Sequence, residues 1–330
     1  MKAAGNVTQM QEIVSSKTSG GPMVTLDDIR AAAGRIRSVA RRTPLLEIAG
    51  GVAVKCENLQ PMGAFKIRGA ANMIAQLTDD ARAAGVITYS SGNHGQAVAL
   101  VAQRFGIPAV VVMPETTPRV KVEGVRRYGA ETIFAGTTTL HRRTRAEAEA
   151  SARGLTMVPP FDHPWIIAGA GTCGLEILEQ YPQVATIYVP VGGGGLISGI
   201  ATAAKQMRRA IRIVGVEPEG AAKMSASRAA GHLVTLERTA SIADGLLAVR
   251  PGELTFQHVQ AYVDDVVTIS DEAIAAAVKY LFHEARIVAE PSGAAALAGA
   301  LQSGASASSG IVAIVSGGNV EPADFARYIA

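Results

Sequence analysis

The chain has 330 residues, of which 48% are hydrophobic and 18% are charged, and its formal net charge is +3. This composition predicts one or two well-packed domains and excludes a disordered chain or a strongly basic nucleic-acid-binding protein. Two cysteines, Cys56 and Cys173, are too few for a disulfide framework, which favours a cytoplasmic location. No apolar run is long enough to span a membrane. Residues 1–24 lack the apolar centre of a signal peptide, and we expect a flexible N-terminal arm there.

Beyond this arm, the pattern alternates between helix-like and strand-like segments. Thr25 is a typical N-cap, with Asp27 and Asp28 in the first turn of a helix that is expected to run to about residue 41. The segments that follow in chain order are a strand at 52–55, a helix after 66, a strand at 86–89, a helix at 94–105, a strand at 109–113, a helix at 117–128, a strand at 132–134, helices at 139–153 and 165–181, a strand at 186–191, a helix from 196, strands at 211–216 and 266–269, helices from 271 and after 290, and a strand at 311–315. Such alternation predicts an α/β fold with parallel sheets covered by helices on both faces.

Glycine-rich loops follow three of the predicted strands, where α/β proteins bind their ligands. Residues 192–195 are four consecutive glycines before a helix, and their backbone N–H groups suit a phosphate. This loop lacks the Lys-Ser/Thr pair of a P-loop and the spacing of a dinucleotide fingerprint. Ser90-Ser91-Gly92-Asn93-His94 offers hydroxyl and amide groups, and Ser316-Gly317-Gly318-Asn319 presents a neutral hydroxyl. Taken singly, each segment is also compatible with an ordinary helix cap or turn.

One lysine lies in the apolar segment Ala64-Phe65-Lys66-Ile67, at the start of a predicted helix. Burial and the positive end of a helix both disfavour an ammonium group. A neutral lysine amine is a nucleophile for carbonyl compounds, including the aldehyde of pyridoxal phosphate. A Phe-Lys pair can also be a core aromatic residue beside a solvated charge, but the phosphate-suited loop elsewhere favours the cofactor interpretation.

In their order and spacing, these motifs resemble the fold type II pyridoxal-phosphate enzymes, and within them the threonine/serine dehydratase (threonine ammonia-lyase) and serine racemase branch. The resemblance extends from about Thr25 to Asn319. Further segments that carry it are Pro160-Phe161-Asp162-His163-Pro164, Ile242-Ala243-Asp244-Gly245, Arg250-Pro251-Gly252-Glu253-Leu254 and Glu290-Pro291-Ser292-Gly293.

This resemblance implies a tryptophan synthase β-like α/β fold, in which two open, twisted parallel-sheet domains hold the cofactor in the cleft between them. We expect residues 25–58 and 156–330 to form a large cofactor-binding domain. Residues 59–155 would form a small domain that closes over the substrate. The family also leads us to expect a homodimer or homotetramer that binds a small amino acid, with no nucleic-acid or membrane partner.

The resemblance assigns roles to individual residues. Lys66 would hold pyridoxal 5'-phosphate as a Schiff base and, once freed, remove the Cα proton, with Ser91 as a second catalytic group on the opposite face. The other cofactor contacts would come from Phe65, Asn93, Gly192, Gly193, Gly194, Gly195, Ser316 and, nearby, Glu290. The substrate would meet Ser90, Ser91, Gly92, His94, Arg142 and Phe161.

The implied reaction is the dehydration and deamination of a β-hydroxy amino acid. L-Threonine would give 2-oxobutanoate and L-serine would give pyruvate, each with ammonia. Ser91 matches serine racemases, whereas Phe161 matches dehydratases, so serine racemisation stays an alternative. Dehydration of threo-3-hydroxyaspartate, with Arg142 facing a second carboxylate, is another alternative. A non-catalytic protein that binds pyridoxal phosphate is a further one.

Several relatives bind Mg²⁺ or Ca²⁺ at positions that here hold Glu217, Ala221 and Lys223. A divalent ion needs several oxygen ligands, usually with more than one carboxylate. Because Lys223 replaces one carboxylate, we expect no metal at this position and an ammonium group paired with Glu217 in its place.

Overall fold

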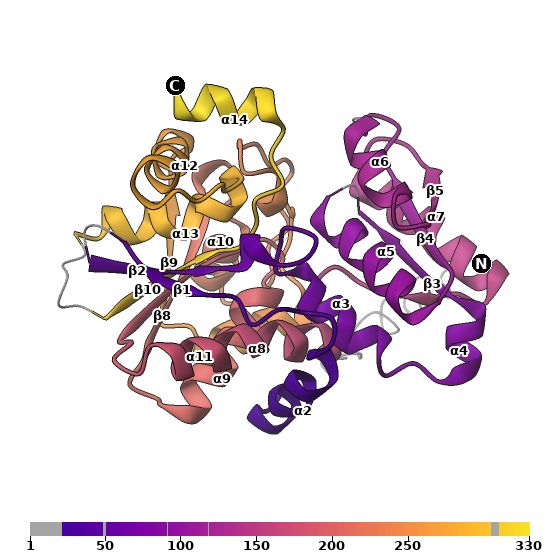
Figure 1. Cartoon of the computed structure of the whole chain (residues 1–330), viewed down its shortest axis with the longest axis horizontal. Coiled ribbons are helices and arrows are strands. Elements are labelled where there is room, and N and C mark those ends of the chain that lie inside the picture. Colours follow the sequence, from indigo (N-terminus) through magenta and orange to yellow (C-terminus); the bar gives the residue numbers. More distant parts are fainter. Residues whose placement is uncertain (1–21, 49–50, 91, 118, 305–309) are drawn as a thin grey trace, which may run out of the picture.

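The structure is a computed structural model, and it describes residues 22–330 except 49–50, 91, 118 and 305–309. It contains two sheets, which lie on opposite sides of the molecule in Figure 1. The larger sheet has six strands, all parallel except the first, which runs antiparallel to its neighbour. In spatial order these strands are β1 (Leu45–Glu47), β2 (Val52–Cys56), β10 (Ile311–Val315), β7 (Thr186–Pro190), β8 (Arg212–Pro218) and β9 (Asp265–Ile269). The predicted α/β class is confirmed.

Helices cover both faces of the larger sheet because its strands alternate apolar side chains between two cores. On β2, Val52 and Val54 pack with the helices of one face, whereas Ala53 packs with those of the other. The first face carries α12 (Asp271–Ala285), α13 (Pro291–Gln302) and, outside them, α14 (Pro322–Ile329). The second face carries α8 (Pro164–Gln180), α9 (Gly195–Met207) and α11 (Glu253–Tyr262). The short helix α10 (Lys223–Ala230) follows β8.

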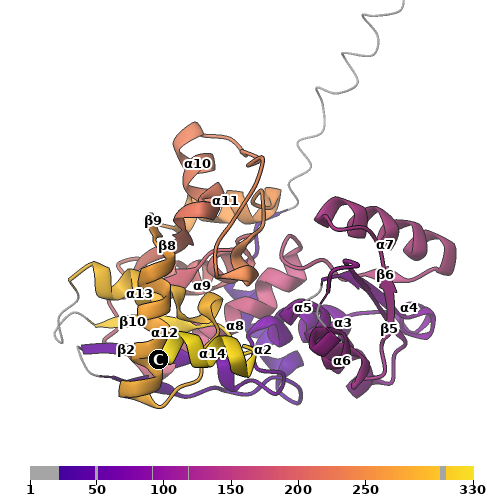
Figure 2. The ribbon, with the colours of Figure 1, turned by 90° about the horizontal axis from the view of Figure 1, so that it is seen from above.

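The smaller sheet is entirely parallel. Its strands, in spatial order, are β5 (Glu131–Phe134), β4 (Ala109–Met113), β3 (Val86–Tyr89) and β6 (Thr156–Met157). The helices α5 (Asn93–Phe105), α6 (Arg119–Arg126) and α7 (Thr139–Arg153) surround it in Figures 1 and 2, and α4 (Asp79–Ala84) lies beside it. Because β6 pairs with β3, this sheet extends to Met157, beyond the boundary that we expected at residue 155.

Between the sheets lies α3 (Lys66–Ile74), which packs against both α5 and α8. The first helix, α2 (Leu26–Ile36), begins as predicted, with a capping box between Thr25 and Asp28. It ends at Ile36 rather than near residue 41, because residues 37–39 tighten into a turn in which the Val39 N–H donates to the Ile36 carbonyl at 2.9 Å. Within the described part of the chain, no helix is long and apolar enough to cross a membrane.

Candidate active site

A cavity of about 720 Å³ lies where the loops of the two sheets meet. Its walls come from the loops that follow β3, β7 and β10 and from the start of α3, as expected for the carboxyl edges of parallel strands. All of the described residues to which the sequence assigns a cofactor or substrate contact line it: Phe65, Lys66, Ser90, Gly92, Asn93, His94, Arg142, Phe161, Gly192, Gly193, Gly194, Gly195, Glu290 and Ser316. Ser91 lies outside the described residues.

Lys66 is the first residue of α3 and extends into the cavity. Its Nζ atom donates a hydrogen bond to the Pro160 carbonyl at 2.6 Å and lies 5.1 Å from the centre of the Phe65 ring. Burial lowers the pKa of Lys66 to about 8. A measurable fraction of this amine is therefore neutral, and nucleophilic, at neutral pH.

The backbone before α3 is fastened to the end of β10. The Phe65 N–H donates to the Ser316 carbonyl at 3.0 Å, and Ala64 and Gly317 form an isolated antiparallel bridge. Ser316 itself is only 4% exposed, and its hydroxyl donates to the Ser292 carbonyl at 3.3 Å. These contacts fix the position of the segment that carries Lys66 relative to Ser316.

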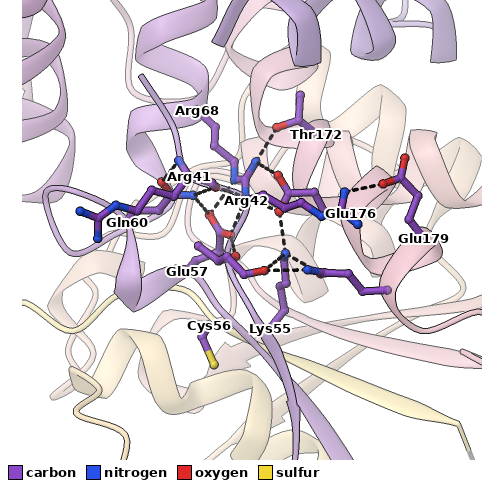
Figure 3. Close-up of polar contacts among 12 residues, drawn as sticks. Arg41, Arg42, Lys55, Cys56, Glu57, Gln60, Arg68, Thr172, Glu176 and Glu179 are labelled. Atoms are coloured by element: carbon purple, nitrogen blue, oxygen red, sulfur yellow. Dashed lines mark hydrogen bonds and ion pairs between the residues drawn. The ribbon is translucent and has the colours of Figure 1, made fainter. Parts of the chain in front are cut away.

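A buried network of charged side chains holds the first turn of α3 in place (Figure 3). Arg68 binds Glu57 through Nε and Nη2, at 2.7 and 2.8 Å, and Glu176 through Nη1 and Nη2, at 2.7 and 2.8 Å. Lys55 donates to Glu176 at 2.6 Å. Burial alone would raise the pKa of Glu57, but Arg68 holds it below its ordinary value. Two cations thus balance two carboxylates, and α3 is tied to the residue that directly follows β2 and to α8.

Asn93, the first residue of α5, connects the smaller unit to the larger one. Its amide group donates to Glu290 at 2.6 Å, and its Oδ1 atom accepts from the Asn319 amide at 2.7 Å. Glu290 is 5% exposed, and burial, together with the negative charge of Asp244, raises its pKa to about 8. Glu290 is therefore mainly neutral at neutral pH.

The tetraglycine loop leaves no room for side chains. A Cβ atom on Gly193 would lie 2.3 Å from the Phe161 ring, and Gly194 has a φ of +101°, which disfavours other residues. The Gly193 carbonyl accepts from Thr255 Oγ1 at 2.7 Å and from the Gly252 N–H at 3.2 Å. Since α9 begins at Gly195, the loop presents the unpaired N–H groups of a helix N-terminus, which is the donor set that a phosphate group needs.

The described residues for which the sequence predicts substrate contacts line the same cavity. His94 is 3% exposed, and its Nε2 lies 3.0 Å from the Val158 carbonyl. Burial, aided by the charge of Lys66, lowers the pKa of His94 to about 3, so this ring is neutral at neutral pH. The Ser90 hydroxyl accepts from the Gly92 N–H at 3.3 Å. Arg142, on α7, donates to the Thr139 hydroxyl at 2.7 Å.

The structure adds contacts that the sequence did not predict. Lys121, on α6, forms an ion pair of 2.6 Å with Asp244 of the larger unit, and both residues line the cavity. Asp244 and Ser292 lie within segments that carry the family resemblance, whereas nothing in the local sequence marks Lys121. Among the described residues, no group of three or more His, Cys, Asp or Glu is placed to hold a metal ion.

These residues fit pyridoxal phosphate: an amine with a lowered pKa, an N-terminal helix loop for the phosphate, and a buried neutral hydroxyl. The family model of pyridoxal-phosphate dependent enzymes matches residues 36–317. The chain belongs to this family. The predicted family, fold type and cofactor are confirmed.

Relatives and solved structures agree with this assignment. The chain is 42% identical over 306 residues to an L-threonine ammonia-lyase of Thermotoga maritima, covering 91% of this chain and 76% of that protein. It is 44% identical over 316 residues to a serine racemase of Oryza sativa subsp. indica, covering 92% and 93% respectively. The structure of maize serine racemase matches with a TM-score of 0.89 and 41% identity, covering 93% of this chain and 97% of that chain.

Proposed function

We propose that the enzyme dehydrates and deaminates a β-hydroxy amino acid, with L-threonine or L-serine as substrate and 2-oxobutanoate or pyruvate plus ammonia as products. The observation that carries this proposal is the pairing of Lys66 with an uncharged wall around Ser316. Pyridoxal phosphate, when bound, supplies the electron sink that stabilises negative charge at the substrate Cα. Lys66 holds the cofactor and, in its neutral form, removes the Cα proton.

The surroundings of Ser316 favour elimination. Its hydroxyl is neutral, and the carboxyl group of Glu290, with a pKa of about 8, is mainly protonated. Neither the Ser316 hydroxyl nor the protonated Glu290 carboxyl would therefore carry a negative charge that raises the pKa of the cofactor's ring nitrogen. Negative charge at Cα is then short-lived, and expulsion of a β-hydroxyl is favoured over slower reactions. Ser90, Gly92 and the α5 N-terminus would bind the substrate carboxylate, with Arg142 and Phe161 at the side chain.

Racemisation of serine is the second candidate. Ser91 supports it, since a hydroxyl opposite Lys66 could return the proton to the other face of Cα. The similarity to a rice serine racemase supports it as well. With threo-3-hydroxyaspartate, the positive charge of Arg142 would meet a second carboxylate, so this compound belongs in any substrate panel.

The test is a panel of L-threonine, L-serine and threo-3-hydroxyaspartate, with 2-oxo acid and D-isomer formation measured for each. We expect 2-oxo acid formation to exceed D-isomer formation, and Ser91→Ala to retain dehydration while losing racemisation. Lys66→Ala should be inactive even with added cofactor. Lys66→Arg should be inactive too, because a guanidinium keeps its charge and is not a nucleophile. A wild-type enzyme that makes mostly D-serine would overturn the dehydratase proposal and leave the family assignment intact.

We also propose a domain organisation, an oligomeric state and a cellular location for the enzyme. Residues 25–58 and 158–330 would form the large cofactor-binding unit, and residues 59–157, which include β6, the unit that closes over the substrate. We propose a homodimer or homotetramer, as is usual in the family, in the cytoplasm. Cys56 and Cys173 are both free and buried, which suits a reducing compartment. Light scattering of the purified holoenzyme tests the oligomeric state.

A further inference from the structure

Lys223, the first residue of α10, is a buried charged residue that the proposed reaction does not use. Its side chain and that of Glu217, on β8, both have 0% exposure and form an ion pair of 2.9 Å. An ammonium group without water requires acceptors on all sides. The surroundings of Nζ therefore indicate what the charge does.

Four oxygen atoms surround this ammonium group. Besides Glu217 Oε1 at 2.9 Å, they are the carbonyl oxygens of Val191 at 2.7 Å, Ala221 at 3.1 Å and Leu246 at 3.1 Å. An ammonium has three N–H donors for these four acceptors, so the site is a cage of oxygen atoms of the kind that holds a small cation. Although burial lowers the pKa of Lys223, Glu217 opposes this shift, and the acceptor-only surroundings favour the ammonium form.

Two of these carbonyls belong to, or directly adjoin, segments that line the cofactor cavity. Val191 directly precedes the tetraglycine loop, and Leu246 ends the turn 244–246, which also lines the cavity. The two segments touch, because a Cβ atom on Gly192 would lie 3.1 Å from the Gly245 carbonyl. Lys223 thus joins the phosphate-suited loop to the neighbouring wall from the side that faces away from the cavity.

Glu217 holds this arrangement in place. Its Oε1 atom also accepts from the Met224 N–H at 2.9 Å, and its Oε2 atom accepts from the N–H and hydroxyl of Ser225, both at 2.9 Å. The carboxylate therefore caps α10 and orients the ammonium group together. Lys223 does not line the cavity, so it acts as a positioning residue.

We propose that the ammonium group of Lys223 is a built-in cation that fixes the tetraglycine loop in its cofactor-binding shape. The enzyme accordingly holds pyridoxal phosphate without any added monovalent or divalent cation. This proposal concerns cofactor binding and is independent of which amino acid is the substrate, so it can fail while the dehydratase proposal holds.

The first test measures the Kd of pyridoxal phosphate by equilibrium dialysis. We expect Lys223→Met to weaken binding about tenfold or more, because the Val191 and Leu246 carbonyls lose a charged donor. The matched control is Lys205→Met on the same unit, since Lys205 pairs with Asp264 at 2.7 Å but does not line the cavity or touch the loop. That variant should bind the cofactor within about twofold of wild type.

Two further variants separate this role from a plain structural ion pair. Lys223→Met/Glu217→Gln leaves no unpaired charge, and we still expect weak cofactor binding. A double variant that unfolds like wild type and binds the cofactor equally well would overturn the proposal. Lys223→Ala leaves space for an ion, so ammonium, but not tetramethylammonium at equal ionic strength, should restore cofactor affinity. A folded Lys223→Ala protein that no cation rescues would contradict the proposal.

Wild type supplies an independent readout that needs no variant. After treatment with a chelator and exchange into a buffer that lacks small cations, its Kd for the cofactor should change by no more than about twofold, because Nζ already fills the cage. A large loss of affinity that Mg²⁺ or K⁺ reverses would show that another ion is required.

Discussion

Lys66 and Glu290 face the same cavity, and burial moves both toward their neutral forms. The pKa of Lys66 falls to about 8, whereas that of Glu290 rises to about 8. An amine that is partly neutral and a carboxyl group that is mainly protonated therefore share one site at neutral pH. Under the function proposed above, Lys66 would supply the nucleophile, and Glu290 would place no carboxylate close to the electron sink.

The raised pKa of Glu290 predicts how stability depends on pH. Between its ordinary value of 4.5 and about 8, the folded protein binds this proton and the unfolded chain releases it. The free energy of unfolding contributed by this group therefore falls as pH rises through that window, by at most about 1.4 kcal/mol per unit. We expect Glu290→Gln to remove this decline in urea unfolding of the cofactor-free protein.

The control for this measurement is Glu47→Gln, which changes an exposed carboxylate on the edge strand β1. This variant should keep the wild-type slope between pH 5 and pH 8. If wild type shows no decline that Glu290→Gln removes, Glu290 is ionised throughout that range.

Much of the site could be predicted from individual residues because parallel strands bring their carboxyl ends to one edge. The tetraglycine loop and Ser316 directly follow predicted strands, and Lys66 begins a predicted helix. The local sequence therefore indicates where each of them lies. The contact between Asn93 and Glu290 spans 197 residues, and the Lys121–Asp244 pair spans 123. Pairings over such distances depend on how the two units pack, which no local pattern specifies.

At the scale of elements, the buried strands and long helices were predicted best. The predicted strands at 86–89, 109–113 and 311–315 match β3, β4 and β10 residue for residue, since unbroken apolar runs leave little choice. The strand β1 and the helix α4 were missed because they are short and mostly exposed. The helices α10, α11 and α14 were missed as well, and the side chains of their N-cap residues accept no hydrogen bond that would mark a start.

The affinity for the cofactor should depend on the backbone shape of the tetraglycine loop before α9. Gly193→Ala would place a methyl group 2.3 Å from the Phe161 ring. We expect the loop to shift and the cofactor Kd to rise about tenfold or more, because a loop that binds through N–H groups depends on their positions. Gly34→Ala, where a Cβ atom meets nothing within 4 Å, should leave the Kd unchanged.

The outcome that contradicts this prediction is a Gly193→Ala protein with wild-type cofactor affinity. Combining Gly193→Ala with Phe161→Ala should recover part of the affinity, since the second change removes the ring with which the methyl group clashes. Dialysis against pyridoxal phosphate measures both variants.

The network behind α3 predicts a large effect on stability. Arg68→Met leaves Glu57 and Glu176 without their main partner, and removing one member of a buried ion network costs about 3–5 kcal/mol. Arg30→Met breaks a pair whose side chains are 58% and 88% exposed, so it should change the free energy of unfolding by less than about 1 kcal/mol. Denaturant unfolding of the two variants should differ accordingly, and equal stabilities would show that the network contributes little.

At the scale of the whole molecule, the Lys121–Asp244 ion pair joins the two units at the cavity. The Lys121–Asp244 pair is half-exposed, with side-chain exposures of 29% and 59%, so it adds less than about 1 kcal/mol to stability. Its position at the cavity suits a role in holding the units together around a substrate. Lys121→Met should therefore raise the KM for the amino acid severalfold with little change in thermal stability.

The comparison for Lys121 is Lys205→Met, which breaks an ion pair within the larger unit. That change should leave KM as it is in wild type. Equal KM values for all three proteins would mean that the Lys121–Asp244 pair has no part in substrate binding.

The strand order has a consequence for how the protein is made. The larger sheet pairs β2 with β10, strands from near the two ends of the described chain, whereas β3 to β6 of the smaller sheet come from one continuous stretch. The smaller sheet can thus assemble early during synthesis, while β2, which can pair at once with its neighbour β1, must wait for β10, made about 260 residues later. Since Ser316 follows β10, the wall of the cavity that Ser316 forms is completed only after this strand has been made.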